Sequence, residues 1–268
     1  MILSDDQFDL IRRLLVERTG VVLEDDQIRF TAGRLLPVAQ KRKWNDLAPL
    51  VAQLRDRHDQ ALAQEVIEAL VTHETSFFRD PHYFDELTDQ VLPQLFARRA
   101  GERRLSIWCA ACSTGQEPYS IAMILRERFP QHLAEWNVQI LATDLSATAL
   151  HQAKSGLFSE VEINRGVSEI RRAQHFTRES TCWRIDHRLM QLMRFQQLNL
   201  IDAWPAMPAH DLILLRNVLI YMGRETRQTI LQRIQTSLRP DGRLMLGSSE
   251  STLGRNLSIA CVYGSTAS

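Results

Sequence analysis

Residues 104–120 read Arg-Leu-Ser-Ile-Trp-Cys-Ala-Ala-Cys-Ser-Thr-Gly-Gln-Glu-Pro-Tyr-Ser, and this stretch decides the fold. Its first half, Leu105 to Ala111, is a short apolar run of the kind that forms a buried parallel strand. Small residues follow at 112–115, and then Pro118, which the first turn of a helix tolerates. The order is strand, tight loop and helix. In open α/β sheets this order directs backbone N–H groups and a helix N-terminus toward a ligand.

The chemistry of this loop narrows the class of ligand. The loop has one glycine, Gly115, so the dinucleotide pattern G-x-G-x-x-G is absent. Glu117 occupies the place where a phosphate would approach, which disfavours pyrophosphate and favours a ligand with a cation or hydroxyl groups. S-adenosylmethionine has an α-ammonium, a sulfonium and a ribose diol. From the loop alone, a plain connection between strand and helix remains an equal alternative.

Composition limits the class of protein. The 268 residues suffice for one large domain or two smaller ones, and 44% hydrophobic with 24% charged residues is typical of a soluble globular chain. Lys+Arg and Asp+Glu are equal at 32 each, so no overall field favours nucleic acid. No run approaches the ~20 apolar residues of a membrane span. The first residues lack a signal peptide's pattern, so we expect a cytoplasmic protein without membrane insertion.

We expect no metal site. Cys109 and Cys112 form a C-x-x-C pair, but Cys182 and Cys261 stand alone, and zinc would need a second close pair or clustered histidines. Because Cys109 lies inside the apolar strand, it is best interpreted as a small core residue.

The first ~70 residues are predicted to be all-helical, because hydrophobic residues recur at helical spacing and no strand pattern is present. Helices are predicted over 5–19, 25–43, 45–57 and 62–73. Pro37 should kink or interrupt the second one. That helix has five basic residues and no acid from Gln27 to Lys43. This basic stretch is either a solvated face or a docking surface for an acidic partner.

The remainder alternates strands and helices, which indicates a parallel sheet. Strands are predicted over 104–111, 138–143, 211–215, 243–248 and 258–263. A further strand is predicted to end at 198–200. Helices are predicted over 82–99, 116–129, 146–154 and 224–238. Residues 239–242, Arg-Pro-Asp-Gly, read as a turn. Residues 156–190 break the rhythm and are predicted to form a helical piece and a small β excursion.

Asp144 ends the second strand of this alternating region. An acid at that position is placed to bind a ribose diol. The alternative is that Asp144 caps the helix over 146–154, a role that Ser146 could equally fill.

Five motifs in order resemble the CheR family, the bacterial chemotaxis-receptor glutamate methyltransferases. They are the 71–79 region with Thr75-Ser76-Phe77-Phe78-Arg79, the stretch 111–120 (Ala-Cys-Ser-Thr-Gly-Gln-Glu-Pro-Tyr-Ser), Ala142-Thr143-Asp144, Leu198-Asn199-Leu200 and Arg216-Asn217-Val218-Leu219-Ile220-Tyr221. The resemblance covers residues 5–263. It implies an α/β fold: a helical N-terminal receptor-docking domain (1–75) and a Rossmann-like class I methyltransferase domain (76–268). The sheet would have seven strands, with an antiparallel β-subdomain inserted at about 160–192.

The resemblance also implies the reaction. The family uses S-adenosylmethionine to convert glutamate side chains on the cytoplasmic helical part of chemoreceptors into methyl esters, leaving S-adenosylhomocysteine. Cofactor contacts carried over onto this chain are His73, where the family often has Asn, and Thr75, Arg79, Glu117, Asp144, Asn199, Leu200, Arg216 and Asn217. Arg79 and Tyr221 match the catalytic pair that faces the substrate carboxylate. A glutamate with a pKa of ~4.3 is already anionic at neutral pH, so the transfer needs positioning and no general base.

Two departures from the family affect the partner. The family docks through its second helix, but this chain has Pro37, Val38 and Gln40 where relatives have clustered arginines. Arg34, Lys41 and Arg42 are therefore the docking candidates here. Relatives that tether to a receptor's C-terminal pentapeptide have a glycine-bearing loop, whereas residues 177–182 have no glycine. We therefore expect an enzyme that does not depend on this tether. A monomer is the default expectation for its oligomeric state.

Two other function classes are weighed against the enzyme. One is a non-catalytic module that binds S-adenosylmethionine or its product and reports it to a signalling partner. The other is a small-molecule methyltransferase or oxidoreductase, which the basic helical domain and the missing dinucleotide glycines disfavour. The presence of Arg79 and Tyr221 favours the enzyme over the module.

Overall fold

The computed structural model describes residues 3–56, 58–250 and 261–262. The chain forms two compact units. We call Met1–Thr72 with Tyr221–Thr229 the helical unit, and His73–Ile220 with Ile230–Ser268 the sheet unit. Within the described ranges, no helix is both long and apolar enough to span a bilayer.

The helical unit confirms the all-helical prediction for the first 70 residues. Its helices are α1 (Asp5–Thr19), α2 (Ile28–Lys41), α3 (Ala48–Arg55) and α4 (Gln60–Leu70), with a 3₁₀ turn η1 (Asp25–Gln27) before α2. Ser4 and Gln7 form a capping box at the start of α1, and Gly20 ends it with φ 74°. Local sequence signals therefore account for both ends of α1.

Pro37 does not interrupt α2, which continues to Lys41. A proline inside a helix removes one backbone hydrogen bond and is disfavoured by itself. Here Leu35 and Ala39, on either side of Pro37, are completely buried. Tertiary packing of both turns therefore outweighs the local cost, and the interruption considered from sequence is absent.

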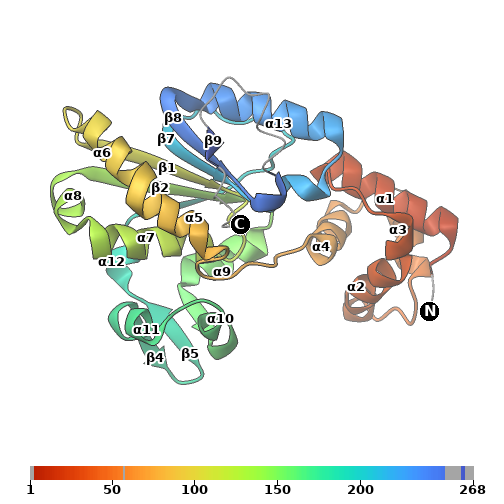
Figure 1. Cartoon of the computed structure of the whole chain (residues 1–268). Coiled ribbons are helices and arrows are strands. Elements are labelled where there is room, and N and C mark those ends of the chain that lie inside the picture. The colour runs from red at the N-terminus through yellow and green to blue at the C-terminus, as the bar shows by residue number, and fades with distance from the viewer. Residues whose placement is uncertain (1–2, 57, 251–260, 263–268) are drawn as a thin grey trace. The chain divides into compact units, whose positions relative to one another are not determined.

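The sheet unit has a parallel sheet with the strand order β6-β2-β1-β7-β8-β9 (Figure 1). The strands are β1 (Arg104–Ala110), β2 (Asn137–Asp144), β6 (Met193–Gln197), β7 (His210–Leu215), β8 (Leu238–Leu246) and β9 (Cys261–Val262). The strand order reverses between β1 and β7, which is the topological switch point of a doubly wound sheet. Among the described residues this sheet has six strands, where the resemblance implies seven. Of the strand expected at 258–263, only 261–262 lie within that part.

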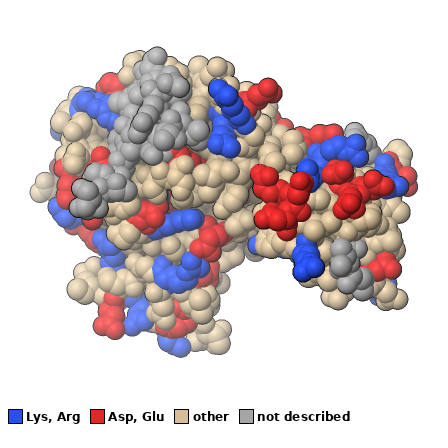
Figure 2. All heavy atoms as spheres, turned by 45° about the vertical axis from the view of Figure 1, so that its right-hand side comes forward, with Lys and Arg blue, Asp and Glu red and all other residues tan. Residues whose placement is uncertain are grey.

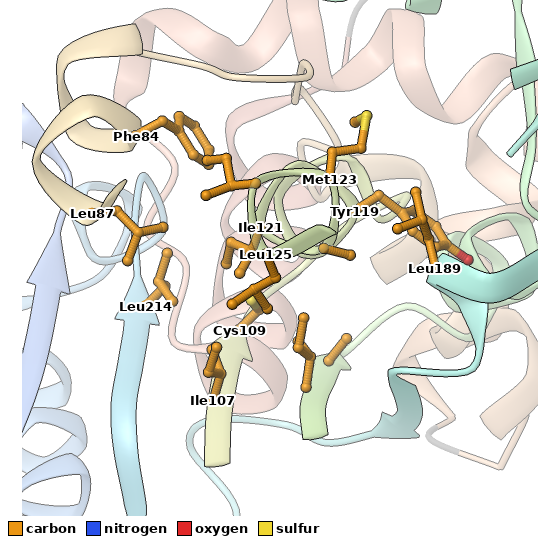
Figure 3. Close-up of a cluster of buried hydrophobic side chains, with 14 of the residues drawn as sticks. Phe84, Leu87, Ile107, Cys109, Tyr119, Ile121, Met123, Leu125, Leu189 and Leu214 are labelled. Atoms are coloured by element: carbon orange, nitrogen blue, oxygen red, sulfur yellow. The ribbon is translucent and has the colours of Figure 1, made fainter. Parts of the chain in front are cut away.

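Helix α7 (Gln116–Arg128) is the centre of the core, and its residues from Pro118 to Leu125 are all buried. In Figure 3 side chains from β1, β7, α5 (Pro81–Glu86), η2 (Leu87–Val91) and α12 (His187–Met190) gather around it. The π-helical turn η2 joins α5 to α6 (Leu92–Arg99), so the helix predicted over 82–99 forms with one irregular turn. Helix α13 (Arg224–Ser237) lies on the opposite side of the sheet from α7 (Figure 1). Two short helices, α8 (Pro130–Glu135) and α9 (Ala147–Ser155), flank β2 in the chain.

The prediction of a turn at 239–242 is wrong, because these residues belong to strand β8. The pairing of β7 with β8 shifts register between His210 and Leu212, as in a β-bulge. Asp241 in this irregular stretch binds the Arg99 guanidinium at 2.6 and 2.9 Å. Turn-forming residues therefore produce a bulge inside a strand instead of a chain reversal.

The break in rhythm at 156–190 is a small antiparallel sheet with the order β3-β5-β4. Its strands are β3 (Leu157–Ser159), β4 (Phe176–Glu179) and β5 (Cys182–Ile185), and it includes helices α10 (Glu160–Asn164) and α11 (Glu169–His175). We call residues 157–185 the β-subdomain. A two-residue turn, Ser180-Thr181, joins β4 to β5, with Ser180 at φ 50°.

The β-subdomain contacts the segment that precedes α5 through a backbone approach. Gly166 has φ +126°, and a Cβ built there would lie 2.0 Å from the Phe77 carbonyl oxygen. The exposed side chains of Arg165 and Glu74 form an ion pair beside it at 2.6 Å. Only glycine fits this position, both for its dihedral angle and for the space it leaves.

We therefore expect Gly166→Ala to lower the free energy of unfolding by about 2–4 kcal/mol through strain and overpacking. The measurement is urea denaturation. Gly101→Ala is the control, because no atom lies within 4 Å of the Cβ position at Gly101. Equal stabilities of the two variants would contradict this reading of the contact.

Candidate active site

Four neighbouring strands deliver the predicted site residues to one edge of the sheet. The loop 111–115 follows β1, Asp144 ends β2, Asn199 follows β6, and Arg216 follows β7. Because these strands are parallel and adjacent, their carboxyl ends meet at the switch point, where open α/β sheets bind ligands. The structure therefore confirms the position expected for a cofactor loop.

The loop after β1 is held by Ser113, which has φ 50°. Its N–H donates to Asp144 Oδ2 at 2.7 Å, and its Oγ donates to the His73 carbonyl at 3.0 Å. The Cys112 N–H donates to the Thr143 carbonyl at 2.8 Å. One small residue thus connects the end of β2, the loop after β1 and the segment 73–80, which we call the entry segment.

Ser146, and not Asp144, caps α9, whereas ribose binding by Asp144 stays a prediction. Ser146 caps α9, because its side chain accepts from the Ala149 N–H at 3.0 Å. Asp144 is buried, and its Oδ1 accepts from the Ser146 N–H at 2.9 Å. The Asp144 carboxylate is therefore oriented by two backbone donors at the end of β2, and the cap is a separate residue.

Arg216 is the most densely bonded side chain of the site. It is 2% exposed, and its guanidinium donates to Glu117 Oε2 at 2.9 Å and to Asp80 Oδ2 at 3.0 Å. It also donates to the Arg79 carbonyl at 2.8 Å and lies 4.5 Å from the centre of the Tyr83 ring. A buried guanidinium needs such compensation, because unpaired burial of a charge is costly. Arg216 thus joins α7, β7 and the entry segment.

Burial raises the pKa of Glu117 above its usual value, and the Arg216 guanidinium partly opposes this rise. The Glu117 side chain is 14% exposed and lies in the first turn of α7. A carboxylate held in such a place gains most from a cation that reaches it. The geometry suits a ligand ammonium better than a phosphate.

The entry segment carries three predicted residues, and backbone hydrogen bonds bring two of them, His73 and Arg79, into this network. Ser113 binds the His73 carbonyl, and Arg216 binds the Arg79 carbonyl. The Arg79 guanidinium itself donates to the Glu74 carbonyl at 3.0 Å. Thr75 is half-buried between them along the chain. Phe78 and Asp80 have φ 49° and 57°, so the segment is sharply bent on both sides of Arg79.

Asn199 and Leu200 lie in the loop after β6, which ends at Gln197, three residues earlier than predicted. The Leu198 N–H donates to the Asp144 carbonyl at 2.9 Å, which places this loop beside β2. Asn199 Nδ2 donates to Asp202 Oδ2 at 3.1 Å. The Leu200 carbonyl accepts from Trp204 Nε1 at 3.2 Å. The loop is thus held by its own bonds next to Asp144.

The two residues predicted as a catalytic pair belong to different units. Arg79 is in the sheet unit and Tyr221 is in the helical unit. The Tyr221 carbonyl accepts from the Val22 N–H at 2.8 Å, and its side chain is 40% exposed. Their pairing stays a prediction.

The docking candidates on α2 are partly used inside the helical unit. Arg42 pairs with Asp59 and Glu65 at 3.2 and 3.1 Å, and Arg34 donates to the Ala69 and Val71 carbonyls. Lys41 has a side chain that is 75% exposed and lies 4.0 Å from Glu65. Of the three, Lys41 is the one most accessible to a partner.

Sequence reasoning missed Asp80 as a member of the site. Its carboxylate is the second ion-pair partner of Arg216, and it precedes Pro81 at the start of α5. The Asp-Pro pair beside two phenylalanines is the only local signal, and a pair of this kind usually indicates a helix start.

Cys109 and Cys112 are both buried, and burial raises the pKa of each thiol well above its ordinary value. Across the described ranges, no group of three or more His, Cys, Asp or Glu side chains is arranged to hold a metal ion. Cys109 is a core residue of β1, as the apolar run predicts.

Residues 73–267 match the family described as CheR methyltransferase, SAM binding domain. The chain belongs to the CheR family. Chemotaxis protein methyltransferase 1 of Pseudomonas aeruginosa is 35% identical over 92% of this chain and 90% of its own. The Vibrio parahaemolyticus chemotaxis protein methyltransferase is 35% identical over 94% and 91%, and the Escherichia coli one is 33% identical over 92% and 85%.

This CheR-family chain is thus a methyltransferase whose cofactor is S-adenosylmethionine. Its parallel sheet with a switch point between β1 and β7 is the Rossmann-like class I arrangement, joined to a helical N-terminal region and carrying a small antiparallel sheet. The fold class and the cofactor expected from the motifs are confirmed.

Proposed function

We propose that this CheR-family enzyme transfers the methyl group of S-adenosylmethionine to glutamate side chains on the cytoplasmic helical part of chemoreceptors, for chemotactic adaptation. The proposal is supported by relatives that are named chemotaxis protein methyltransferases over nearly their whole length. The observation that carries it is the bonded group formed by Glu117, Arg216 and the entry segment beside Asp144.

The residues present fit this cofactor. Glu117 offers a largely buried carboxylate to the α-ammonium, and Asp144 offers a fixed carboxylate to the ribose diol. We assign the further contacts to His73, Thr75, Arg79, Asn199, Leu200, Arg216 and Asn217. When bound, the cofactor supplies a methyl group on a positively charged sulfur.

The protein's contribution to the reaction is orientation. The accepting glutamate is already anionic at neutral pH, so no residue has to remove a proton. We assign to the Arg79 guanidinium the binding of this carboxylate through its planar fork, and to the Tyr221 hydroxyl a second hydrogen bond. Holding oxygen and methyl in line supplies most of the rate. Phe77 and Phe78, directly before Arg79 in the chain, are buried, and we assign to them the exclusion of water from the site.

We assign receptor docking to the helical N-terminal domain, residues 1–75, and catalysis to residues 76–268, in a cytoplasmic monomer. Figure 2 shows Lys and Arg interspersed with Asp and Glu on the face drawn of each unit. Docking therefore depends on individual cations of α2, and Lys41 is the most exposed candidate.

The experiment that tests the function is transfer of labelled methyl from S-adenosylmethionine to membranes rich in chemoreceptors, followed by an alkaline wash. Base-labile label on a band of receptor size identifies a glutamyl methyl ester. Binding of the cofactor without transfer to any receptor would instead support a non-catalytic sensor.

Arg79→Ala should lower kcat for receptor methylation by about 100-fold, because the accepting carboxylate is no longer oriented. Cofactor affinity should fall less. The measurement is steady-state methylation together with calorimetry of S-adenosylhomocysteine binding. Arg165→Ala is the control, since it removes the ion pair with Glu74 from the same segment. Unchanged kcat in Arg79→Ala would refute the assigned role.

Cofactor affinity should fall as the pH is lowered, and the fall should begin at a higher pH than for an ordinary glutamate, because burial raises the pKa of Glu117. Above that pKa the carboxylate is ionised and attracts the α-ammonium; below it the group is neutral. Calorimetry with S-adenosylhomocysteine measures the slope, which Glu117→Gln should flatten. Glu74→Gln should keep the wild-type slope, because a hydrogen bond from Arg165 lowers the pKa of Glu74. Identical slopes in wild type and Glu117→Gln would exclude this role.

We also propose that the enzyme acts without a pentapeptide tether. The connection between β4 and β5 is a two-residue turn, and residues 177–182 have no glycine. A pulldown with an immobilised receptor C-terminal pentapeptide should retain no more enzyme than a scrambled peptide. Sequence-specific retention at micromolar affinity or better would overturn the proposal.

A further inference from the structure

Glu250 is a charged residue that is completely buried, in the 3₁₀ turn η4 (Ser248–Glu250) directly after β8. Its carboxylate accepts four backbone N–H groups. Oε2 binds Asn217 at 2.8 Å and Gly247 at 2.9 Å, while Oε1 binds Val218 at 2.9 Å and Leu219 at 2.7 Å. Three of these donors are consecutive residues of the loop that follows Arg216.

This arrangement has little spare room. A Cβ at Gly247 would lie 2.7 Å from Glu250 Oε2 and 3.0 Å from the Asn217 nitrogen. Asn217 itself has φ 58°, in the left-handed region that non-glycine residues rarely adopt. The carboxylate therefore binds the backbone of the loop after β7 where it turns through Asn217, a residue type that tolerates the left-handed region.

The bonds of Glu250 compensate for its burial. A carboxylate in an apolar interior is strongly unfavourable unless its oxygens accept hydrogen bonds, and four N–H groups match its acceptor capacity. The charge of Glu250 also acts on a residue of the site. Burial raises the pKa of Glu117, and the negative charge of Glu250 raises this pKa further. Glu250 thus lies within electrostatic range of the Arg216 network.

We propose that Glu250 is a positioning residue of the cofactor site: it fixes the backbone of residues 217–219 so that Arg216 and Asn217 are presented to the cofactor. The inference rests on the proposed assignment of these two residues as cofactor contacts. Its effect passes through Asn217, because Glu250 bonds to that residue's N–H while the Asn217 side chain carries the contact.

The conservative test is Glu250→Gln. The amide keeps the shape of the side chain, but one oxygen becomes an NH₂ group that faces two N–H donors. The two hydrogen bonds to the replaced oxygen are lost, and the new NH₂ group faces two backbone N–H groups, so that donors point at donors. We expect S-adenosylhomocysteine to bind about tenfold more weakly, because the loop after β7 then populates the binding conformation only in part and the apparent affinity falls by that fraction. Glu250→Asp keeps the charge and should lie between wild type and Glu250→Gln.

Binding is measured by calorimetry on the full chain, at a temperature where circular dichroism shows each variant folded. Glu102→Gln is the matched control, because it removes an exposed ion pair with Arg239 at the start of β8 and should leave the affinity unchanged. Wild-type affinity in Glu250→Gln would overturn the inference. If Glu250→Gln does not fold, Glu250→Asp decides, because the shorter carboxylate cannot reach all four donors and should also bind more weakly. Wild-type affinity in that variant would overturn the inference as well.

A double-mutant cycle with Asn217→Ala separates this inference from the site assignment on which it rests. If Glu250 acts through Asn217, the double variant should bind no more weakly than the weaker single variant. Additive losses would show that Glu250 does not act through Asn217 and would overturn the inference. Wild-type affinity in Asn217→Ala would refute the site assignment itself, and the inference with it. Weak binding in Asn217→Ala with full affinity in Glu250→Gln would refute the inference alone.

Discussion

The ion pairs of Arg216 are the interaction on which the candidate site depends. Its buried guanidinium forms ion pairs with Glu117 of α7 and with Asp80 at the start of α5, and it donates a hydrogen bond to the Arg79 carbonyl. Three segments far apart in sequence thereby share one charge centre. Because the Arg216 guanidinium would be a costly buried charge without these acceptors, the site depends on all three being in place.

Local patterns predicted much of the fold. Some signals involve only residues that are close together in the sequence, and these could be recognised without a structure. They are the apolar run at β1, the cap at Ser4 and the glycine at position 20. Prediction failed where tertiary contacts decide. Helix α2 continues through Pro37 because the residues around the proline are packed in the core. Residues 239–242, which usually form turns, lie instead in a bulge of β8, where Asp241 binds Arg99.

The candidate site divides in the same way. The motifs located Glu117, Asp144 and Arg216, because strand ends and helix starts mark those positions. Asp80 and Glu250 carried no comparable signal. Asp80 is interpreted from sequence as the residue before a helix, and Glu250 is separated by about thirty residues from three of the four backbone groups it binds. Their roles arise only when distant segments meet, which no pattern of spacing records.

The contact between Gly166 and Phe77 has a consequence for how the β-subdomain can vary among relatives. It holds the loop between α10 and α11 of the β-subdomain against the entry segment, with no space for a side chain at that point. The turn Ser180-Thr181 lies at the tip of a hairpin, and such tips accept insertions readily. The hairpin tip can therefore change in length and in sequence as partners change, whereas position 166 has to remain glycine.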